Sequence, residues 1–441
     1  MKLQALDLSM IEPDEGSFGI GPYEIKGTNS VFKFNLNSLS THLLFLGSTG
    51  TGKTNGILQF VNIIKNSIMG QDDVMVIFDT KGDYHSEFYC KERGDVIISN
   101  DINVENEEEI WNIFDEVTID DAKCWDQNAY EITRVMYDEK ISKAKDPFFP
   151  QAASDVTRGA VMALLRNSIS INKSASNNDL VQILGRSDST ELNSLLQSYD
   201  DLRGISQYIS LPSSSQTQGV MSEIRSITND IFSGGFSKIG KFSVRNFIRQ
   251  RGGRTLFIEY DLNWGRLLTP IYRLLIDLAI KESLGRSSHL RGNVFFVTDE
   301  FSLLPNLYHV DDGINFGRQQ GTKFIVGTQN ISQVLEAYGE GRGKSILSNF
   351  GILFAFRLND QDSRNLVAGR YGKYRVRITL PSLVPSEPLS NHVVESDVLE
   401  PLALSLLPNG CCIICSSGIK PKLFQFALNK KRTGILGNIE T

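Results

Sequence analysis

The sequence lacks any apolar run long enough to cross a membrane. A spanning helix needs roughly 18 to 20 uninterrupted apolar residues, and no segment of the 441-residue chain reaches that length. The amino-terminal stretch MKLQALDLSMIEPDEG also lacks the cationic flank and the apolar core of a signal peptide. We therefore expect a cytoplasmic chain with no direct membrane span.

Cysteine is scarce, with five residues in the whole chain. Three of them, Cys411, Cys412 and Cys415, lie close together in GCCIICSSG, a spacing that resembles part of a zinc site. No second CxxC pair and no nearby histidine complete a tetrahedral ligand set. We interpret CCIIC instead as a buried strand in a reducing compartment, and we expect no metal at these thiols.

The chain also lacks an excess of positive charge, since its formal net charge is -6. This value argues against a protein that coats nucleic acid with a basic surface. It does not exclude a nucleic-acid partner, because a protein that encloses a strand needs positive charge only along the enclosed path. The apolar fraction of 41% and the charged fraction of 22% are typical of globular domains and exclude a disordered or fibrous chain.

Three nearly continuous apolar runs stand out along the chain: THLLFLG (41–47), DVMVIFDT (73–80) and NVFFVTDE (293–300). Such runs are typical of parallel strands that are covered on both faces. Between the first two, Ile57, Leu58, Val61 and Ile64 recur at helical spacing. The order strand, loop, helix, strand predicts a βαβ unit.

From about residue 113 to 245 the sequence becomes polar and helix-forming, and strand-like runs then return with RTLFIEYD, TKFIVGTQ and FGILFAFRL. We therefore predict an α/β fold with a mostly parallel central sheet and an inserted all-helical domain. The predicted boundaries are 1–112 for the first part of the core, 113–245 for the helical insertion and 246–441 for the second part of the core.

A phosphate-binding loop lies between the first apolar run and the helix that follows it. The segment matches GxxxxGK[ST] at every position, with the residues Gly47, Ser48, Thr49, Gly50, Thr51, Gly52, Lys53 and Thr54. Glycines allow backbone N–H groups to approach phosphates closely, a lysine reaches the β and γ oxygens, and a hydroxyl binds Mg²⁺. The segment predicts a site for ATP and Mg²⁺, with Lys53 and Thr54 in these last two roles.

Hydrolysis also needs a carboxylate near the metal and another that orients water. Asp299 and Glu300 end the run NVFFVTDE, and we assign Asp299 to the metal and Glu300 to the attacking water. Asp79 ends another run and is followed by Lys81. Either this pair lies near the phosphates at a neighbouring strand end, or DTKGD is a turn without a chemical role. Both interpretations stay open.

Two further side chains complete the predicted site. Gln329 follows the run KFIVGT and is assigned as a sensor of the γ-phosphate, the alternative being a solvated loop amide. Arg318 lies at the end of a predicted helix, where a lone arginine is most often a surface charge. An arginine from a neighbouring subunit commonly neutralises the transferring phosphoryl group, so we assign Arg318 to that role.

The combination of GSTGTGKT, FDTKGD, FFVTDEFSLL, GRQQGTKFIVGTQNISQVLEAYG and LSNFGILFAFRLNDQDSRNLVAGRYG resembles the TraD/TraG type of conjugative coupling protein. The resemblance implies a RecA-like P-loop core with an inserted helical domain. It also implies a hexameric ring that hydrolyses ATP and moves DNA, single- or double-stranded, through its centre. Asp299-Glu300 then resembles the Walker B pair, Arg318 the arginine that acts in trans, and Gln329 the sensor.

One departure from that family keeps other functions open. Coupling proteins mostly begin with a pair of membrane-anchoring helices, whereas this chain starts almost directly on the core. Recruitment to the inner face of the membrane would then come from partners such as a relaxase or a secretion channel. A HerA/FtsK-like motor working with a partner nuclease in repair or phage defence is an alternative, as is a slow nucleotide-dependent assembly switch.

The expected DNA contacts are less specific. Arg342 and Lys344 in YGEGRGKSIL predict a flexible, glycine-flanked basic loop that follows the nucleic-acid backbone. An exposed, solvated loop without a partner explains the same residues equally well.

Overall fold

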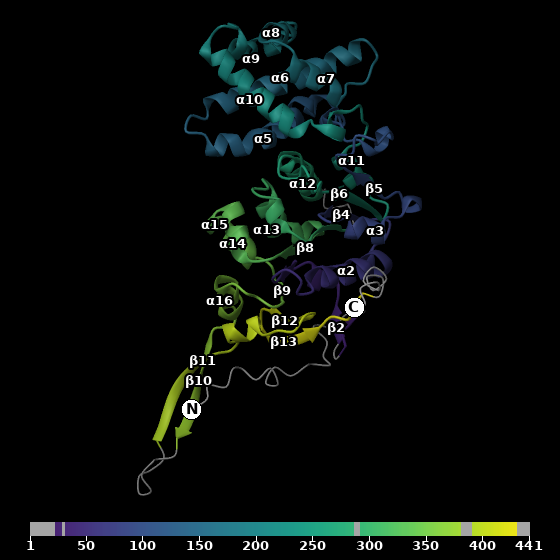
Figure 1. Ribbon diagram of the computed structural model, residues 1–441. Helices are drawn as coiled ribbons and strands as arrows, with labels where there is room; N and C mark the ends of the chain where they lie inside the picture. Colours follow the sequence, from purple (N-terminus) through teal and green to yellow (C-terminus); the bar gives the residue numbers. More distant parts are fainter. Residues whose placement is uncertain (1–22, 29–30, 286–291, 381–389, 430–441) are drawn as a thin grey trace, which may run out of the picture. The chain divides into compact units, whose positions relative to one another are not determined.

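The computed structural model describes residues 23–28, 31–285, 292–380 and 390–429, with side chains omitted at 376–380 and 390–392 (Figure 1). The chain forms two compact units. The first unit comprises Met1–Ile68, Asp299–Ser302 and Lys323–Thr441, and the second comprises Met69–Thr298 and Leu303–Thr322. No described helix combines the length and hydropathy that crossing a membrane requires.

The strands are β1 (Tyr23–Lys26), β2 (Val31–Phe34), β3 (Leu43–Leu46), β4 (Val74–Asp79), β5 (Val96–Ile98), β6 (Arg254–Glu259), β7 (Val294–Thr298), β8 (Thr322–Thr328), β9 (Ile352–Ala355), β10 (Lys373–Leu380), β11 (Ser390–Asp397), β12 (Cys411–Ser416) and β13 (Ile419–Gln425). Nine of them follow the order β13-β12-β9-β3-β8-β7-β4-β6-β5. Strands β3, β4, β5, β6, β7, β8 and β9 pair with one another in parallel wherever a register is defined, which confirms the predicted mostly parallel α/β sheet.

The α-helices are α1 (Leu36–Leu39), α2 (Lys53–Ile63), α3 (Asp83–Phe88), α4 (Ile113–Val117), α5 (Trp125–Lys143), α6 (Phe148–Ser170), α7 (Asn177–Val181), α8 (Ser189–Gln197), α9 (Arg203–Ser206), α10 (Ser215–Ile231), α11 (Val244–Gln250), α12 (Thr269–Leu284), α13 (Val310–Gln320), α14 (Ile331–Tyr338), α15 (Glu340–Ser348) and α16 (Gln361–Gly369).

In the first unit, β3 lies between β8 and β9, and all four of its residues are buried. Helix α2 packs on this part of the sheet through aromatic side chains. The rings of Phe45 and Phe354 stack with centroids 4.6 Å apart, and the ring of Phe60 meets both at 5.5 and 5.3 Å. Aromatic pairs of this kind contribute beyond the area they bury, so the strand that leads into the phosphate-binding loop is firmly held.

Strand β12 contains the cysteine cluster and pairs antiparallel with both β9 and β13. Residues Cys411–Cys415 of this strand are buried, which confirms the predicted buried strand. Burial raises the pKa of Cys415 to about 12 and that of Cys412 well above its usual value.

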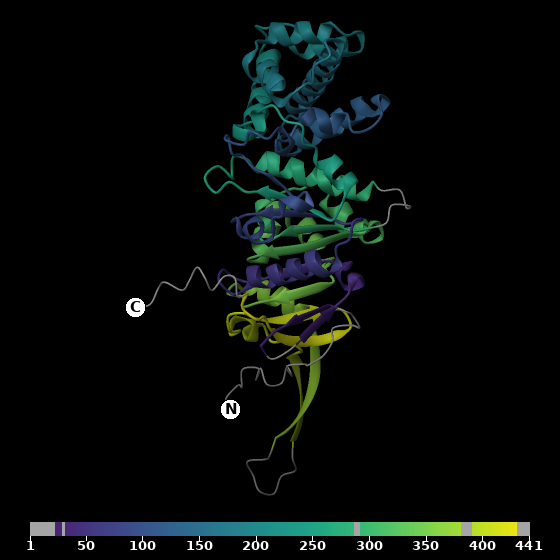
Figure 2. The same cartoon turned by 90° about the vertical axis from the view of Figure 1, so that its right-hand side faces the viewer.

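The first unit also carries a two-stranded ribbon, β10 and β11, which pairs antiparallel from Lys373↔Asp397 to Leu380↔Ser390. Figures 1 and 2 show the ribbon projecting from the part of this unit formed by β12 and β13.

In the second unit, β4 is the central strand and is buried at every position. It pairs in parallel with β7 on one side and with β6 on the other, and β5 continues beyond β6. Both faces of such strands must be covered, and the buried side of α12, including Ile271, Leu274 and Leu275, supplies part of that cover.

All described elements between β5 and β6 are helical, as the polar stretch from 113 to 245 predicts. Figures 1 and 2 show α5, α6, α7, α8, α9 and α10 grouped at one end of the second unit, with α12 between this group and the strands. Helices α5 and α10 both pack against α12.

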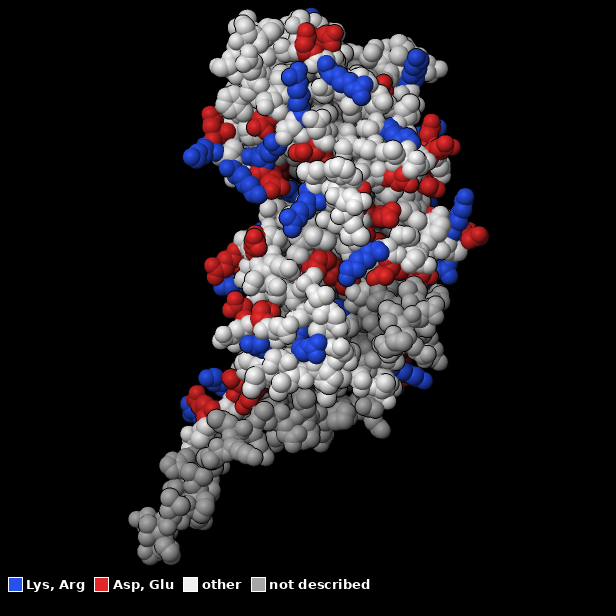
Figure 3. Space-filling model, viewed as in Figure 1, with Lys and Arg blue, Asp and Glu red and all other residues white. Residues whose placement is uncertain are grey.

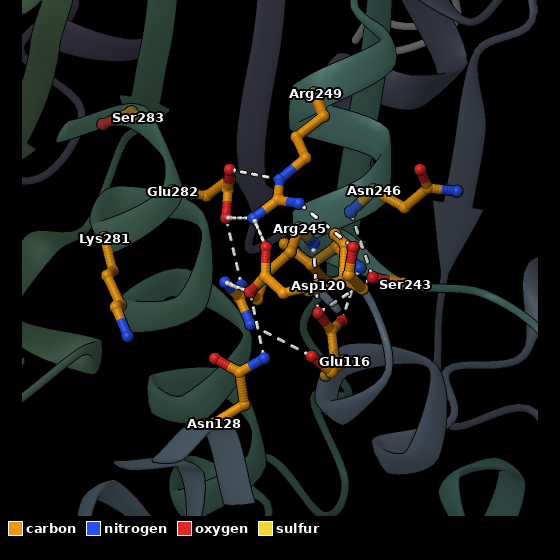
Figure 4. Close-up of polar contacts among 12 residues, drawn as sticks. Glu116, Asp120, Asn128, Ser243, Arg245, Asn246, Arg249, Lys281, Glu282 and Ser283 are labelled. Carbon is orange, nitrogen blue, oxygen red and sulfur yellow. Dashed lines mark hydrogen bonds and ion pairs between the residues drawn. The ribbon is translucent and has the colours of Figure 1, made fainter. Parts of the chain in front are cut away.

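A partly buried polar cluster joins α4 and the residues that follow it to α11 and α12 (Figure 4). Arg245 on α11 is buried and donates from Nε to Glu282 on α12 at 3.0 Å and from Nη2 to Asp120 at 3.1 Å. Arg249 bonds the same two carboxylates from the next turn. Glu116 on α4 is fully buried and accepts from the Val244 and Arg245 N–H groups at 2.5 and 3.2 Å, so it caps the start of α11.

Candidate nucleotide site

The phosphate-binding loop follows β3 and leads directly into α2, which begins at Lys53. Gly50 and Gly52 have φ values of 76° and 111°, which only glycine adopts without strain. A side chain at Gly47 would place its Cβ 2.6 Å from Cβ of Phe356. The glycines are therefore required by the fold of the loop, and they leave its backbone open to a close approach by phosphate.

Lys53 is buried, and its ammonium group folds back over the loop. Nζ donates to the carbonyl oxygen of Gly47 at 2.5 Å and to that of Ser48 at 3.4 Å. A buried ammonium needs such acceptors. The same position, at the amino end of α2, suits a lysine that reaches the β and γ oxygens of a nucleotide.

Thr54 and Asp299 meet directly, since the Thr54 hydroxyl donates to the Asp299 carboxylate. Asp299 follows β7, is buried and belongs to the first unit together with the loop. A hydroxyl and a carboxylate in contact are the two ligand types expected around Mg²⁺ in a P-loop site. The residues present therefore fit the ion, and these two would hold it.

Glu300 is bonded to the predicted sensor. Gln329 Nε2 donates to Glu300 Oε2 at 2.8 Å, and Gln329 Oε1 accepts from the Thr49 hydroxyl at 3.0 Å. Ser302 donates to the other carboxylate oxygen, Oε1, at 2.7 Å. The loop, the sensor and the predicted base thus form one chain of hydrogen bonds, in which each carboxylate oxygen of Glu300 has a donor.

Three supporting contacts were missed by the sequence analysis. The Ser48 N–H donates to the carbonyl of Arg357 at 2.9 Å, the Asn359 N–H donates to the Ser48 hydroxyl at 3.2 Å, and the Gly410 N–H donates to the carbonyl of Thr51 at 2.9 Å. No pattern in the sequence signals them, because the partners lie more than 300 residues from the loop.

Asp79 ends β4 in the second unit and is fully buried. Its Oδ2 accepts from the N–H groups of Tyr84 and His85 at 3.1 and 2.8 Å and lies 3.0 Å from Nδ1 of His85. The carboxylate therefore holds the turn into α3. This contact gives Asp79 a local structural role, and a part in nucleotide binding stays a prediction.

Arg318 lies in the last turn of α13 in the second unit, as predicted, and is exposed. Its side chain makes no hydrogen bond or ion pair within the described ranges of the chain. Helix α13 leads into the amino end of β8, whereas the phosphate-binding loop leaves the carboxyl end of β3, a parallel neighbour of β8. The chain therefore enters β8 from the end opposite to the one where nucleotide-binding loops emerge.

The prediction of a flexible loop at Arg342 and Lys344 is wrong, because both residues lie in helix α15. Lys344 forms an ion pair with Glu340 at 2.6 Å, and the Arg342 guanidinium lies over the ring of Tyr338 at 5.3 Å. Figure 3 shows basic and acidic side chains interspersed over one face of the chain, with no continuous basic stripe among the described residues of that face. A DNA contact at Arg342 and Lys344 stays a prediction.

The fold is shared with solved conjugative coupling proteins. The unbound TrwBdeltaN70 form of such a protein matches with a TM-score of 0.71 at 18% identity, covering 92% of this chain and 88% of that one. A TrwB structure in complex with ADP and Mg²⁺ matches with a TM-score of 0.70, at 18% identity and 93% and 90% coverage. VirB4 of Thermoanaerobacter pseudethanolicus matches with a TM-score of 0.56 at 12% identity, covering 94% and 98%.

Two conjugation proteins are similar to this chain in sequence. The coupling protein TraD of Escherichia coli is 22% identical over 344 residues, which is 74% of this chain and 43% of TraD. The conjugal transfer protein TraG of Agrobacterium fabrum is 27% identical over 129 residues, 29% of this chain and 20% of TraG. The chain therefore spans less than half the length of these relatives.

The sequence model of the type IV secretion-system coupling protein DNA-binding domain matches residues 29–384, which is most of the chain and includes every residue of the site described above except Gly410. On this match, the protein belongs to the type IV secretion coupling protein family.

Proposed function

We propose that the protein is an ATPase that assembles into a ring, for which we infer six copies, and uses hydrolysis to move DNA through it. The observation that carries the proposal is the bonding within the first unit. Thr54 contacts Asp299, while Thr49, Gln329 and Glu300 form a continuous chain. These contacts support the roles that P-loop hydrolysis would give to Thr54, Asp299, Glu300 and Gln329.

The role proposed for each residue follows from these contacts. Lys53 would bind the β and γ oxygens, and Thr54 and Asp299 would hold Mg²⁺, which supplies charge neutralisation when it is bound. Glu300 would orient the attacking water and accept its proton. Because Gln329 bonds Glu300 and Thr49 at once, its amide would report the presence of the γ-phosphate to the residue that handles the water.

Arg318 is proposed to complete the site of a neighbouring copy. Its guanidinium has no partner among the residues that the structure describes, and its helix enters the sheet at the amino end of β8. A free cation in that place is suited to a site on another chain, where it would neutralise the transferring phosphoryl group.

The substrate is proposed from the family. The matched sequence model describes a DNA-binding domain, and TrwB structures include complexes with ADP and Mg²⁺ and with an ATP analogue. A relaxase-bound DNA strand delivered to a secretion channel is the cargo that a conjugative coupling protein would carry. The chain itself would be recruited by those partners at the inner face of the membrane.

The test measures the ATPase rate against protein concentration, with and without single- and double-stranded DNA. Lys53→Ala should lower the rate at least about a hundredfold by removing a charge at the phosphates. Glu300→Gln should lower it by about 10²- to 10⁴-fold and leave ATP binding intact, because only water activation is lost. Glu336→Gln is the matched control, because it makes the same change in charge at an exposed residue of α14, and it should behave like the wild type.

Normal turnover by Glu300→Gln would show that the base assignment is wrong. A rate that rises with protein concentration but does not respond to DNA would favour a nucleotide-dependent assembly switch. Co-purification of a nuclease whose activity depends on ATP would favour the alternative motor in repair or phage defence.

A further inference from the structure

Asn55 follows Thr54 in the first turn of α2 and is buried. A buried amide needs hydrogen-bond partners inside the protein, and both polar atoms of this one have them. Nδ2 donates to the carbonyl of Ala427 at 2.9 Å, and Oδ1 accepts from the N–H of Asn429 at 3.0 Å. The residue next to the predicted magnesium ligand is thus bonded to backbone that lies 372 and 374 residues further along the chain.

The segment 426–429, which follows β13, is also bonded to the phosphate-binding loop. The Phe426 N–H donates to the carbonyl of Gly410 at 2.9 Å, and the Gly410 N–H donates to the carbonyl of Thr51 at 2.9 Å. The loop and the first turn of α2 therefore share one support. Gly410 and the segment lie beyond residue 384, where the match to the family model ends.

Side-chain packing brings the segment close to α2 as well. The Phe426 ring is buried and stacks on Phe356 with centroids 5.7 Å apart. A Cβ at Gly56 of α2 would lie 3.2 Å from Phe426 and 3.3 Å from Phe356, which is tighter than ordinary contact. Glycine at this position lets the helix lie directly against the two rings.

The part of α2 that is supported in this way is the turn that would bind phosphate. The first intrahelical bond runs from the Gly56 N–H to the carbonyl of Gly52 at 3.0 Å. The N–H groups before that bond, and the side chains of Lys53 and Thr54, belong to the turn that faces phosphates in P-loop sites. Ligand-binding groups need support that holds them to within about 0.5 Å. Asn55 supplies such support before the nucleotide arrives, which lowers the entropy cost of binding.

We infer that the segment 426–429 is part of the nucleotide site, because its bonds to Asn55 keep Lys53 and Thr54 in place for the phosphates of ATP. Asn55 is a positioning residue, since it acts through these two neighbours. Its loss weakens the binding of ATP and leaves the chemical step almost unchanged, because the phosphates are bound alike in the ground state and in the transition state. The inference rests on the proposed function, as it concerns the same site.

The first test is Asn55→Ala in the full chain. The dissociation constant of a fluorescent ATP analogue with Mg²⁺ should rise about tenfold, because two hydrogen bonds to the phosphate-binding turn are lost. The KM for ATP should rise by a similar factor, while kcat stays within about twofold of the wild-type value. Denaturant unfolding of the same variant measures the accompanying loss of stability.

Gln59→Ala is the matched control. Gln59 Nε2 donates to the same carbonyl of Ala427 at 2.5 Å, but from one turn further along α2. This variant should lose stability and keep the wild-type affinity for the analogue. If Asn55→Ala and Gln59→Ala lower the affinity equally, in proportion to the stability that each loses, the contacts serve only the fold and the inference is overturned.

Asn429→Pro tests the contact from its other side, because proline removes the N–H that Asn55 accepts and leaves α2 unaltered. The dissociation constant should rise about threefold, since one of the two bonds is lost. Combined with Asn55→Ala, the effect should be smaller than the product of the two, because both changes remove the same bond. Wild-type affinity in Asn429→Pro would overturn the inference. A wild-type protein that does not bind the analogue would overturn the proposed function itself, and the inference with it.

Discussion

At the residue scale, Arg357 is a residue whose backbone the structure joins to the phosphate-binding loop. It follows β9, the parallel neighbour of β3, and its carbonyl accepts from the N–H of Ser48 in the phosphate-binding loop. Its guanidinium makes no hydrogen bond or ion pair with the described residues. A free cation whose backbone is bonded to the loop is well suited to attract the negative charge of a bound nucleotide.

We predict that Arg357→Ala raises the KM for ATP by about ten- to a hundredfold, because a charge-assisted contact contributes about 1.5–3 kcal/mol. Arg357→Lys should recover part of that loss, since it restores the charge without the planar fork. Steady-state ATPase kinetics and binding of a fluorescent nucleotide would check both changes. An Arg357→Ala variant with the wild-type KM and affinity would show that this side chain plays no part in binding.

At the element scale, Glu116 joins α4 to α11. Its carboxylate accepts from Trp111 Nε1 at 3.0 Å, from the Ser243 hydroxyl at 2.9 Å and from the N–H groups that open α11. Every one of these neighbours donates. The site therefore requires a side chain with a hydrogen-bond acceptor at both oxygen positions. Burial raises the pKa of Glu116 to about 7, and the hydrogen bonds from Ser243, Val244 and Arg245 act in the opposite direction.

We predict that Glu116→Gln destabilises the protein by about 1–3 kcal/mol, because one amide N–H₂ group would face donors and leave a buried bond unmade. Denaturant unfolding followed by circular dichroism would measure the loss. Glu108→Gln, an exposed change of the same kind, should fall within about 0.5 kcal/mol of the wild type. Equal stability of the two variants would contradict the capping role of Glu116.

Helix α15 forms although its local sequence predicts a loop. Three glycines around Arg342 and Lys344 predict a loop, since glycine disfavours a helix interior. In the structure Gly343 lies where a Cβ would come within 2.9 Å of Leu335 Cδ2 and 3.2 Å of the Leu335 backbone. Close packing of α15 on α14 requires a glycine there, and burial of Ile346 and Leu347 stabilises the helix.

At the scale of the whole molecule, Arg318 is proposed to complete the nucleotide site of a neighbouring copy. ATP hydrolysis then needs residues from two chains. We predict that Arg318→Ala alone lowers kcat by about 10³-fold or more. Mixing it with Lys53→Ala should restore activity, because an intact phosphate-binding loop on one chain then meets an intact Arg318 on the next. The rate of the mixture, measured over a range of ratios, should exceed the sum of the separate rates.

A mixture whose rate equals that sum would place Arg318 in its own site or outside catalysis. The Arg318→Lys variant serves as a control for charge, and we expect it to remain poorly active because lysine lacks the planar fork of donors. Sedimentation of the variants would show that lost activity is not lost assembly.

The sequence by itself determined the phosphate-binding loop, its glycines, the strands that flank it and the Asp299-Glu300 pair, because these features depend on local periodicity and backbone conformation. The tertiary structure decided which side chains meet. The bond between Thr49 and Gln329 joins residues 280 positions apart, the support of the loop comes from Arg357 and Gly410, and α15 is a helix through its packing on α14. Contacts of this kind depend on how strands are ordered and helices packed, and neither is encoded in the spacing of nearby residues.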